Sequence, residues 1–198
     1  AEFGTYDAQG AIGLRIDDRP RLNLAGQVFH TDSFRAQSET DRANFAGRYN
    51  LAITDRLDLA LSTRLHDSEA DGAARITRAQ FGVDPFGIDP RTLNDAADKS
   101  FGSFRADVNS SIEPNLRLLT FAYNTQQKFT RYFTRPVTAT RFLQREETYD
   151  RDVYGLGANL NGRAAVAGRE LDFVVGIEGF NEITEFQFFD GLDFQRRV

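Results

Sequence analysis

Alternation of apolar and polar residues is the feature that most constrains how this chain can fold. In the stretch FGSFRADVNSSI, residues 101–112, the apolar residues Phe104 and Val108 alternate with Arg105 and Asp107. A period of two places successive side chains on opposite faces of a β-strand. The same alternation recurs in 10–17, 21–30, 42–53, 57–66, 116–127, 151–161 and 171–180. Together with a short strand over 1–7, the pattern predicts about nine strands and no helix.

The predicted connections differ in length, and short ones alternate with long ones. Short turns rich in Asp, Asn, Pro or Gly are expected at 17–20, 54–56, 113–115 and 164–170. Long connections are expected at 34–41, 67–99 and 128–148. In an up-and-down meander of antiparallel strands, this order places every short turn at one end and every long loop at the other. Outer-membrane barrels show this asymmetry.

Composition excludes several classes of protein. The chain has 198 residues, a net charge of −5 and no cysteine, which argues against general nucleic-acid binding and rules out thiol chemistry. Two histidines make a histidine-rich metal centre improbable. No run of about 18 apolar residues is present, so no transmembrane helix is expected. A mean hydropathy of −0.46 fits a soluble protein, and equally a membrane barrel with a polar lumen.

The composition of the polar face indicates whether the apolar face is turned toward lipid or toward an enclosed core. The polar face is rich in small residues and in arginine, whereas lysine, which protects the strand edges of soluble sheets, occurs only at Lys99 and Lys128. Segments 116–133 and 171–189 also exceed the 9–11 residues that cross a bilayer, about 30 Å thick in its hydrocarbon core. We therefore expect the apolar rows to face lipid. The alternative is a soluble lipocalin-like barrel or sandwich that encloses them.

Two finer expectations follow from this orientation. Within 116–127, the apolar row is expected to consist of Leu119, Phe121 and Tyr123. Since tryptophan is absent, other aromatic residues are expected to supply the interfacial girdles of a membrane barrel, namely Phe45, Tyr49, Phe104, Phe121, Tyr123, Tyr154 and Phe173.

The chain resembles the N-terminal part of the barrel domain of TonB-dependent outer-membrane receptors of the ferric-siderophore type. AEFGTYDAQG (1–10) is similar to the opening of their first barrel strand, which reads G-S-Y-D. LAGQVFHTDSFR (24–35) and the stretch 42–72 are similar to the following strands. ITRAQFGVDPFGIDPRTLND (76–95) resembles the pattern L-T-x-A-Q-F-x-x-D-P-R, with Phe86-Gly87-Ile88 as an insertion.

The resemblance implies an all-β, antiparallel up-and-down transmembrane β-barrel, of which residues 1–198 form about nine strands of a barrel of about 22 strands. The remaining strands and the plug domain are expected outside this chain. An eight-stranded self-contained barrel is the alternative if 1–7 is not a separate strand.

The function implied by the resemblance is import of a ferric siderophore or a similar iron complex across the outer membrane of a Gram-negative bacterium. The ferric siderophore is the transported ligand, and no covalently bound cofactor, resident metal or catalytic residue is expected. The implied partners are the TonB complex, the plug domain, and outer-membrane lipids and lipopolysaccharide, but not nucleic acid. The alternatives are a small outer-membrane pore or structural barrel, and a soluble binding barrel.

Arginine and aromatic residues interleave after Lys128, in what the sequence predicts to be a long loop. Guanidinium groups bind carboxylate, hydroxamate or catecholate oxygens, and aromatic rings stack on ring-bearing ligands. The third long loop adds two phenylalanines. The candidate ligand-binding residues are therefore Arg131, Tyr132, Phe133, Arg135, Arg141, Phe142, Arg145, Phe81 and Phe86. Contact with lipopolysaccharide phosphates, or a plain solvated loop, remains the alternative for these residues.

Overall fold

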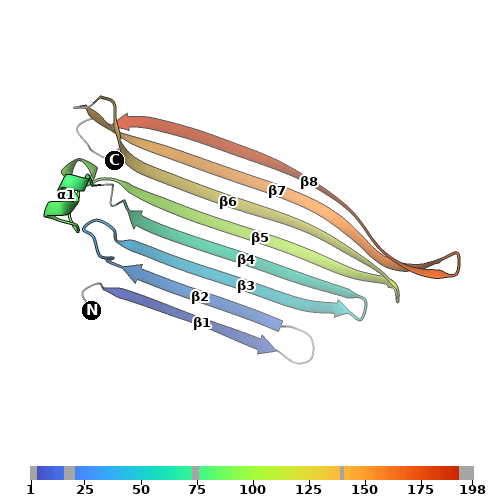
Figure 1. Ribbon diagram of the computed structural model, residues 1–198. Helices are drawn as coiled ribbons and strands as arrows, with labels where there is room; N and C mark the ends of the chain where they lie inside the picture. The colour runs from blue at the N-terminus through green and yellow to red at the C-terminus, as the bar shows by residue number, and fades with distance from the viewer. Residues whose placement is uncertain (1–3, 16–20, 73–75, 139–140, 192–198) are drawn as a thin grey trace.

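The computed structural model describes residues 4–15, 21–72, 76–138 and 141–191, which form one antiparallel sheet. The strands follow sequence order from β1 to β8, and each pairs with its neighbours in the chain (Figure 1). They are β1 (Thr5–Arg15), β2 (Arg21–Thr31), β3 (Thr40–Thr54), β4 (Leu57–Asp71), β5 (Ala96–Glu113), β6 (Leu116–Pro136), β7 (Phe142–Val166) and β8 (Arg169–Gly191). Between β4 and β5 lie a short helix, α1 (Arg78–Val83), and a 3-10 turn, η1 (Pro90–Thr92).

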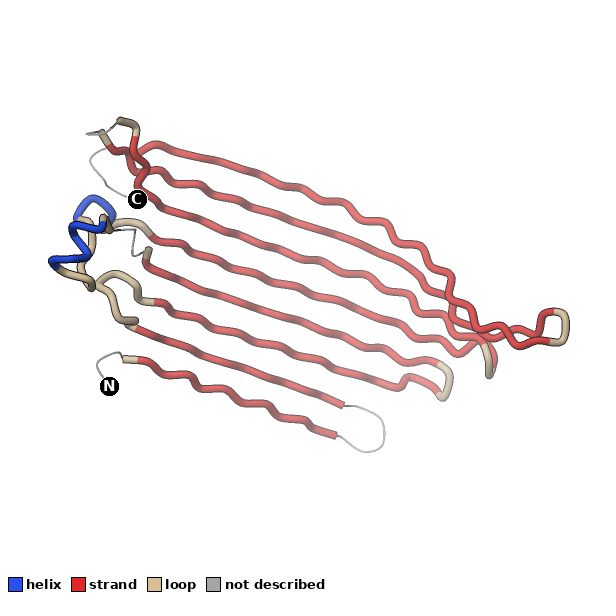
Figure 2. Tube along the Cα trace, in the orientation of Figure 1, coloured by secondary structure: helices blue, strands red, loops and turns tan. Residues whose placement is uncertain are grey.

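Turns and loops lie at opposite ends of the sheet, as the alternating connection lengths predict (Figure 2). At one end, the β3–β4, β5–β6 and β7–β8 connections each consist of two residues. The last of these turns contains Ala167 and Gly168 in the left-handed region, with φ of 51° and 77°. At the other end, residues 32–39, 72–95 and 137–141 connect the strands. We call these the turn end and the loop end. The predicted turn at 17–20 lies outside the described residues.

In the described part of the chain, no helix is long and apolar enough to cross a membrane.

Three expectations about the elements were wrong. The structure describes eight strands rather than about nine, because β1 (Thr5–Arg15) runs continuously through the described parts of the segments predicted at 1–7 and 10–17. A helix exists: Thr77 caps α1, accepting a hydrogen bond from the Gln80 backbone amide while the Gln80 side chain accepts one from the Thr77 amide. The stretch 128–148 is mostly strand, since β6 continues to Pro136 and β7 begins at Phe142.

The two faces of the sheet differ in chemistry, and neither packs against a second layer (Figure 1). We define the polar face as the one that carries Arg105 and Asp107, and the apolar face as the one that carries Phe104, Ala106 and Val108. Cross-strand register assigns the other strands: Leu61 pairs with Ala106, for example, and so lies on the apolar face. Large apolar-face side chains are exposed, including Phe104 (50%), Leu156 (68%) and Ile177 (77%).

An enclosed apolar core is absent from the described residues. The buried hydrophobic residues are Ala60, Ala96 and Phe121, two of which are alanines. A soluble lipocalin-like barrel or sandwich would instead enclose the leucine and valine rows within a core. An apolar face of this extent is unstable in water and fits contact with lipid.

Strand β6 corrects one assignment of faces. Register pairs Phe121 with Asp107 and Tyr123 with Arg105, so Leu119, Phe121 and Tyr123 lie on the polar face rather than on the apolar face. Phe121 and Tyr123 therefore also drop out of the expected aromatic girdle. The reason is the sequence itself: Leu118 and Leu119 are adjacent, and Ala122 lies between two aromatic residues, so apolar residues occupy both faces of β6. Only pairing with β5 and β7 determines which set points where.

Adjacent residues on β7 test the assignment of faces. Ala158 pairs with Thr120 and Ile177 on the apolar face, whereas Asn159 pairs with Leu119 and Gly176 on the polar face. Replacing Ala158 with Arg is expected to cost about 2–4 kcal/mol of stability in a bilayer, because the charge must enter hydrocarbon. Asn159→Arg is the matched control and is expected to cost much less. Equilibrium unfolding of both variants in lipid vesicles measures this difference, and equal costs would contradict the lipid-facing orientation.

Candidate functional site

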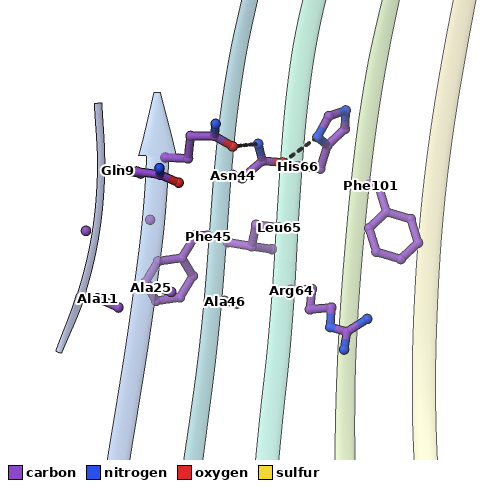
Figure 3. Close-up of a pocket in the computed structure, with 13 residues that line it drawn as sticks. Gln9, Ala11, Ala25, Asn44, Phe45, Ala46, Arg64, Leu65, His66 and Phe101 are labelled. Carbon is purple, nitrogen blue, oxygen red and sulfur yellow. Dashed lines mark hydrogen bonds between the residues drawn. The ribbon is translucent and has the colours of Figure 1, made fainter. Parts of the chain in front are cut away.

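A groove on the polar face crosses the first five strands and encloses about 660 Å³. Figure 3 shows the polar side chains that line it, among them Gln9, Asn44, Arg64 and His66, together with the ring of Phe101. These residues come from neighbouring strands and share a face because of their register: Gln9 pairs with Gln27, Gln27 with Asn44, Asn44 with His66, and His66 with Phe101.

Hydrogen bonds between side chains connect this wall from β1 to β4. The Gln27 amide donates to Asp7 Oδ1 at 2.9 Å, and the Asn44 amide donates to Gln27 Oε1 at 3.1 Å. His66 Nδ1 lies 2.7 Å from Asn44 Oδ1 (Figure 3). Because that oxygen only accepts, His66 Nδ1 carries the hydrogen of this bond. A polar ladder of this kind fixes side-chain orientations on a hydrated surface.

Midway along β5 to β8, aromatic rings lie flat against the polar face. The Arg105 guanidinium carbon lies 4.2 Å from the centre of the Phe121 ring, and Arg105 Nε donates to Asp107 Oδ1 at 2.8 Å. Tyr123 stacks beside Phe121, with ring centres 6.4 Å apart, and its hydroxyl donates to Glu178 at 2.8 Å. This arrangement leaves the guanidinium held from one side by a carboxylate and from the other by an aromatic face.

Two glycines of β7 make room for these rings. A Cβ atom at Gly155 would lie 2.2 Å from Cζ of Tyr123, and one at Gly157 would lie 2.5 Å from Cζ of Phe121. Both distances are well below van der Waals contact. The glycines therefore let the rings of β6 lie over β7 instead of projecting from the sheet.

Toward the loop end, the polar face of β6, β7 and β8 carries arginines beside aromatic rings. Arg131 lies over the Phe133 ring at 4.4 Å, and Arg145 lies 5.2 Å from the centre of the Phe188 ring. Arg145 Nε also donates to Asp190 at 2.9 Å. Farther toward the turn end, Arg151 donates to Glu182 at 2.6 Å. Paired guanidinium groups next to exposed rings can form charge-assisted hydrogen bonds and stack on an aromatic ligand.

The structure divides the predicted ligand-binding residues into three groups. Strand alternation brings four of them onto the polar face and leaves two on the apolar side of the same strands, while the rest lie in loops. The polar-face group is Arg131, Phe133, Arg135 and Arg145; the apolar-side group is Tyr132 and Phe142; the loop group is Arg141, Phe81 and Phe86. The expected position of the residues from Arg131 to Arg145 in one long loop was wrong, because β6 and β7 extend through most of it, whereas Phe81 and Phe86 lie in the connection between β4 and β5 as expected.

The 76–95 loop packs on the apolar side of β6 and β7. The Thr134 hydroxyl lies 2.9 Å from the Arg91 carbonyl and 2.8 Å from Asp95 Oδ1, and Gln144 Nε2 donates to the same Asp95 oxygen at 3.1 Å. Arg91 lies over the Phe142 ring at 3.9 Å. The loop that carries Phe81 and Phe86 is thus attached to the side of the sheet opposite to Arg131 and Phe133.

Burial raises the pKa of Asp95 above its ordinary value, and the donors Thr134 and Gln144 offset only part of this effect. Asp95 is 8% exposed, and it lies outside the strands. Ionisation of a carboxyl group in this position is unfavourable, because the buried charge loses its hydration. The loop is therefore most stable on β6 and β7 when Asp95 is protonated.

Sequence reasoning missed several residues of the polar face. Phe121 and Tyr123 were assigned to the opposite face, and the ladder from Asp7 to His66 carries no recognisable motif. Phe186 and Phe188 come from the part of β8 in which aromatic residues lie on the polar face and Glu185 and Gln187 lie on the other. Register, rather than residue type, assembles this surface.

No protein-family model matches the chain, and no curated protein matches it either. Solved structures do match. The ferric citrate transporter FecA, in its unliganded form, superposes with a TM-score of 0.84 at 14% identity, over 96% of this chain and 28% of FecA. The siderophore receptor PiuA from Acinetobacter baumannii gives 0.75 at 11%, over 97% and 32%. The ferric-catecholate import receptor Fiu from E. coli gives 0.70 at 12%, over 92% and 33%.

The chain thus has the fold of the up-and-down barrel wall of TonB-dependent receptors, as the sequence resemblance predicts. It spans about a third of the length of the receptors that it matches. These neighbours are receptors and transporters rather than enzymes.

Substituting Gly157 of β7 tests the packing of the aromatic rings. Gly157→Ala places a methyl group 2.5 Å from Phe121 and 2.8 Å from the backbone oxygen of Ile177, so we expect a loss of about 1–3 kcal/mol in unfolding free energy. Gly179→Ala, where a Cβ meets nothing within 4 Å, is the control. Denaturant unfolding in detergent compares the two. Equal stabilities would show that the rings do not lie over β7.

The pH dependence of the loop tests the burial of Asp95. Its folded-state pKa is raised, so the stability it gives the loop is fully present below the unfolded pKa, about 3.9, and falls as the pH rises through the folded pKa. Asp95→Asn keeps the accepting oxygen without the charge. We expect it to increase hydrogen-exchange protection of 76–95 several-fold at pH 7, and to change little near pH 4. Asp84→Asn, at an exposed position of the same loop, should leave the hydrogen-exchange protection of 76–95 unchanged at both pH values.

Proposed function

We propose that this chain is part of the barrel wall of an outer-membrane receptor that imports a ferric siderophore or a similar iron complex. The observation that carries the proposal is the match of nearly the whole sheet to receptors named for ferric citrate, ferric catecholate and siderophores. The polar face adds chemical support, because its loop-end half combines arginines with exposed aromatic rings. An iron complex with anionic oxygen donors and ring groups suits both features.

The open sheet supports a larger barrel. Strands β1 and β8 lie at opposite edges and differ in length, with 11 and 23 residues (Figure 1). Within lipid, every backbone N–H and C=O group must be paired, so neither edge can face hydrocarbon. Further strands that complete a barrel of about 22 strands satisfy both edges. An eight-stranded self-contained barrel would need β1 and β8 to pair along edges that do not match.

The plug domain and the TonB complex of the proposed receptor lie outside this chain. A plug domain would fill the lumen against the polar face, and the TonB complex would pull on it to open a path for the ligand. The apolar face would contact lipids and lipopolysaccharide of a Gram-negative outer membrane. The chain's own contribution is to bind and orient the ligand and to line its path, without covalent chemistry.

Two neighbouring aromatic residues provide a matched test of ligand binding. Phe133 lies on the polar face under Arg131, whereas Tyr132 lies on the other face of β6. If the polar face binds the iron complex, Phe133→Ala should weaken binding about tenfold, or about 1.4 kcal/mol, which is near the upper end of the roughly 0.5–1.5 kcal/mol of an aromatic stacking contact. Tyr132→Ala should leave it unchanged. Binding of radiolabelled ferric complexes to the full-length protein in detergent measures both affinities.

Cellular uptake tests the function itself. Deleting the gene should reduce uptake of one labelled ferric siderophore under iron limitation, and deleting the TonB protein should abolish that uptake. Unchanged uptake of all ferric complexes, combined with TonB-independent passage of small solutes, would contradict the proposal and identify a pore.

A further inference from the structure

A histidine and two carboxylates meet at the loop end of β2 and β3. His30, near the end of β2, is the cross-strand partner of Asp41 at the start of β3, and Glu39 immediately precedes β3. The three side chains lie on the apolar-face side of the sheet, where the strands become polar: Asp41 pairs in turn with Glu69 of β4. Two of the three residues are therefore fixed by a regular β-ladder.

The distances fit a single ion. His30 Nδ1 lies 2.9 Å from Asp41 Oδ1 and 3.8 Å from Glu39 Oε1, and one donor atom from each residue lies within 4.8 Å of the others. Zinc–nitrogen and zinc–oxygen bonds of about 2.0–2.2 Å place neighbouring ligand atoms about 3–3.6 Å apart. Small rotations of the exposed Glu39 side chain would bring all three donors to that separation.

The rest of the imidazole is oriented as in metal-binding histidines. His30 Nε2, the nitrogen that faces away from Asp41, lies 3.0 Å from Asp32 Oδ1. The Tyr6 ring stacks on His30, with centres 5.1 Å apart and planes 21° apart. A carboxylate on the non-ligating nitrogen fixes the tautomer and the ring orientation of a ligating histidine. This support comes from Asp32 and Tyr6, which are not part of the donor set.

We propose that His30, Glu39 and Asp41 form a binding site for a divalent transition metal such as zinc. One imidazole nitrogen and two carboxylate oxygens are ligands of open zinc sites, and an imidazole favours zinc over calcium or magnesium. The neighbouring Asp32 and Glu69 add further negative charge, which a cation compensates. Side-chain exposures of 19% for His30 and about half for Glu39 and Asp41 leave a coordination position open to water. The site is independent of iron-complex import.

Zinc titration of the full-length protein in detergent tests the site. The protein is stripped with a chelator and titrated with Zn²⁺ alone, in competition with a zinc-sensitive dye. We expect one saturable equivalent that is lost in His30→Ala and weakened about 10- to 100-fold in Asp32→Asn, a variant that removes the carboxylate beside His30 but none of the three proposed ligands. Excess Ca²⁺ should not displace the zinc.

His66→Ala is the matched control, because His66 lies on the polar face and bonds to Asn44. It should retain the zinc equivalent that His30→Ala loses. The proposal is overturned if wild type and His30→Ala bind equal amounts of zinc, or if Ca²⁺ competes equally well. Melting temperatures of the metal-free variants separate loss of ligand from loss of fold, and Asp32→Asn keeps the test valid if His30→Ala does not fold. Iron-complex uptake provides an independent readout, so failure of this site leaves the proposed function intact.

Discussion

Pairing of backbone hydrogen-bonding groups between all neighbouring strands of one continuous sheet is the constraint on which this structure depends. Each strand pairs with its sequence neighbour over nearly its full length, with irregularities confined to Ala52/Thr54 and Ser111/Glu113 beside the turns. In hydrocarbon, an unpaired amide costs several kcal/mol, so register cannot slip without exposing backbone or turning a whole row of side chains to the wrong face. The ladder therefore determines the surface chemistry, rather than the reverse.

Strand length shows that backbone pairing extends beyond the part of the sheet that would lie in hydrocarbon. From β1 to β7 the strands lengthen from 11 to 25 residues, beyond the 9–11 needed to span a bilayer. On the apolar face, leucine, valine and isoleucine give way toward the loop end to the row of Asp67, Ser100, Lys128 and Asp150, which share one register. Strand pairing continues past the apolar band, which keeps the polar-face side chains beyond it on a rigid support.

The sequence predicts the fold class, the up-and-down order and the separation of turns from loops, because each follows from local alternation and turn residues. The assignment of side chains to the two faces cannot be predicted from the sequence where both faces of a strand are apolar. Around Leu118 and Leu119 the alternation fits either orientation, and only the partners on β5 and β7 resolve it. The sequence also mistakes strand for loop near Arg131, because polar residues on both faces resemble a loop once the lipid-facing pattern ends.

Strand extension separates charge between the two faces at the loop end. The polar face there carries more bases than acids: Arg42, Lys99, Arg131, Arg135, Arg145 and Arg151 against Asp7, Glu147, Glu182 and Asp190. The opposite face carries mostly acids, with Lys128 as a base among Asp41, Asp67, Glu69, Asp71, Asp98, Glu146, Asp150, Asp152 and Glu185. Because strand alternation places the two sets on opposite sides of one thin wall, an anionic solute is repelled from one side and attracted to the other. A wall built in this way would concentrate anions in the lumen and not along the outside of the barrel.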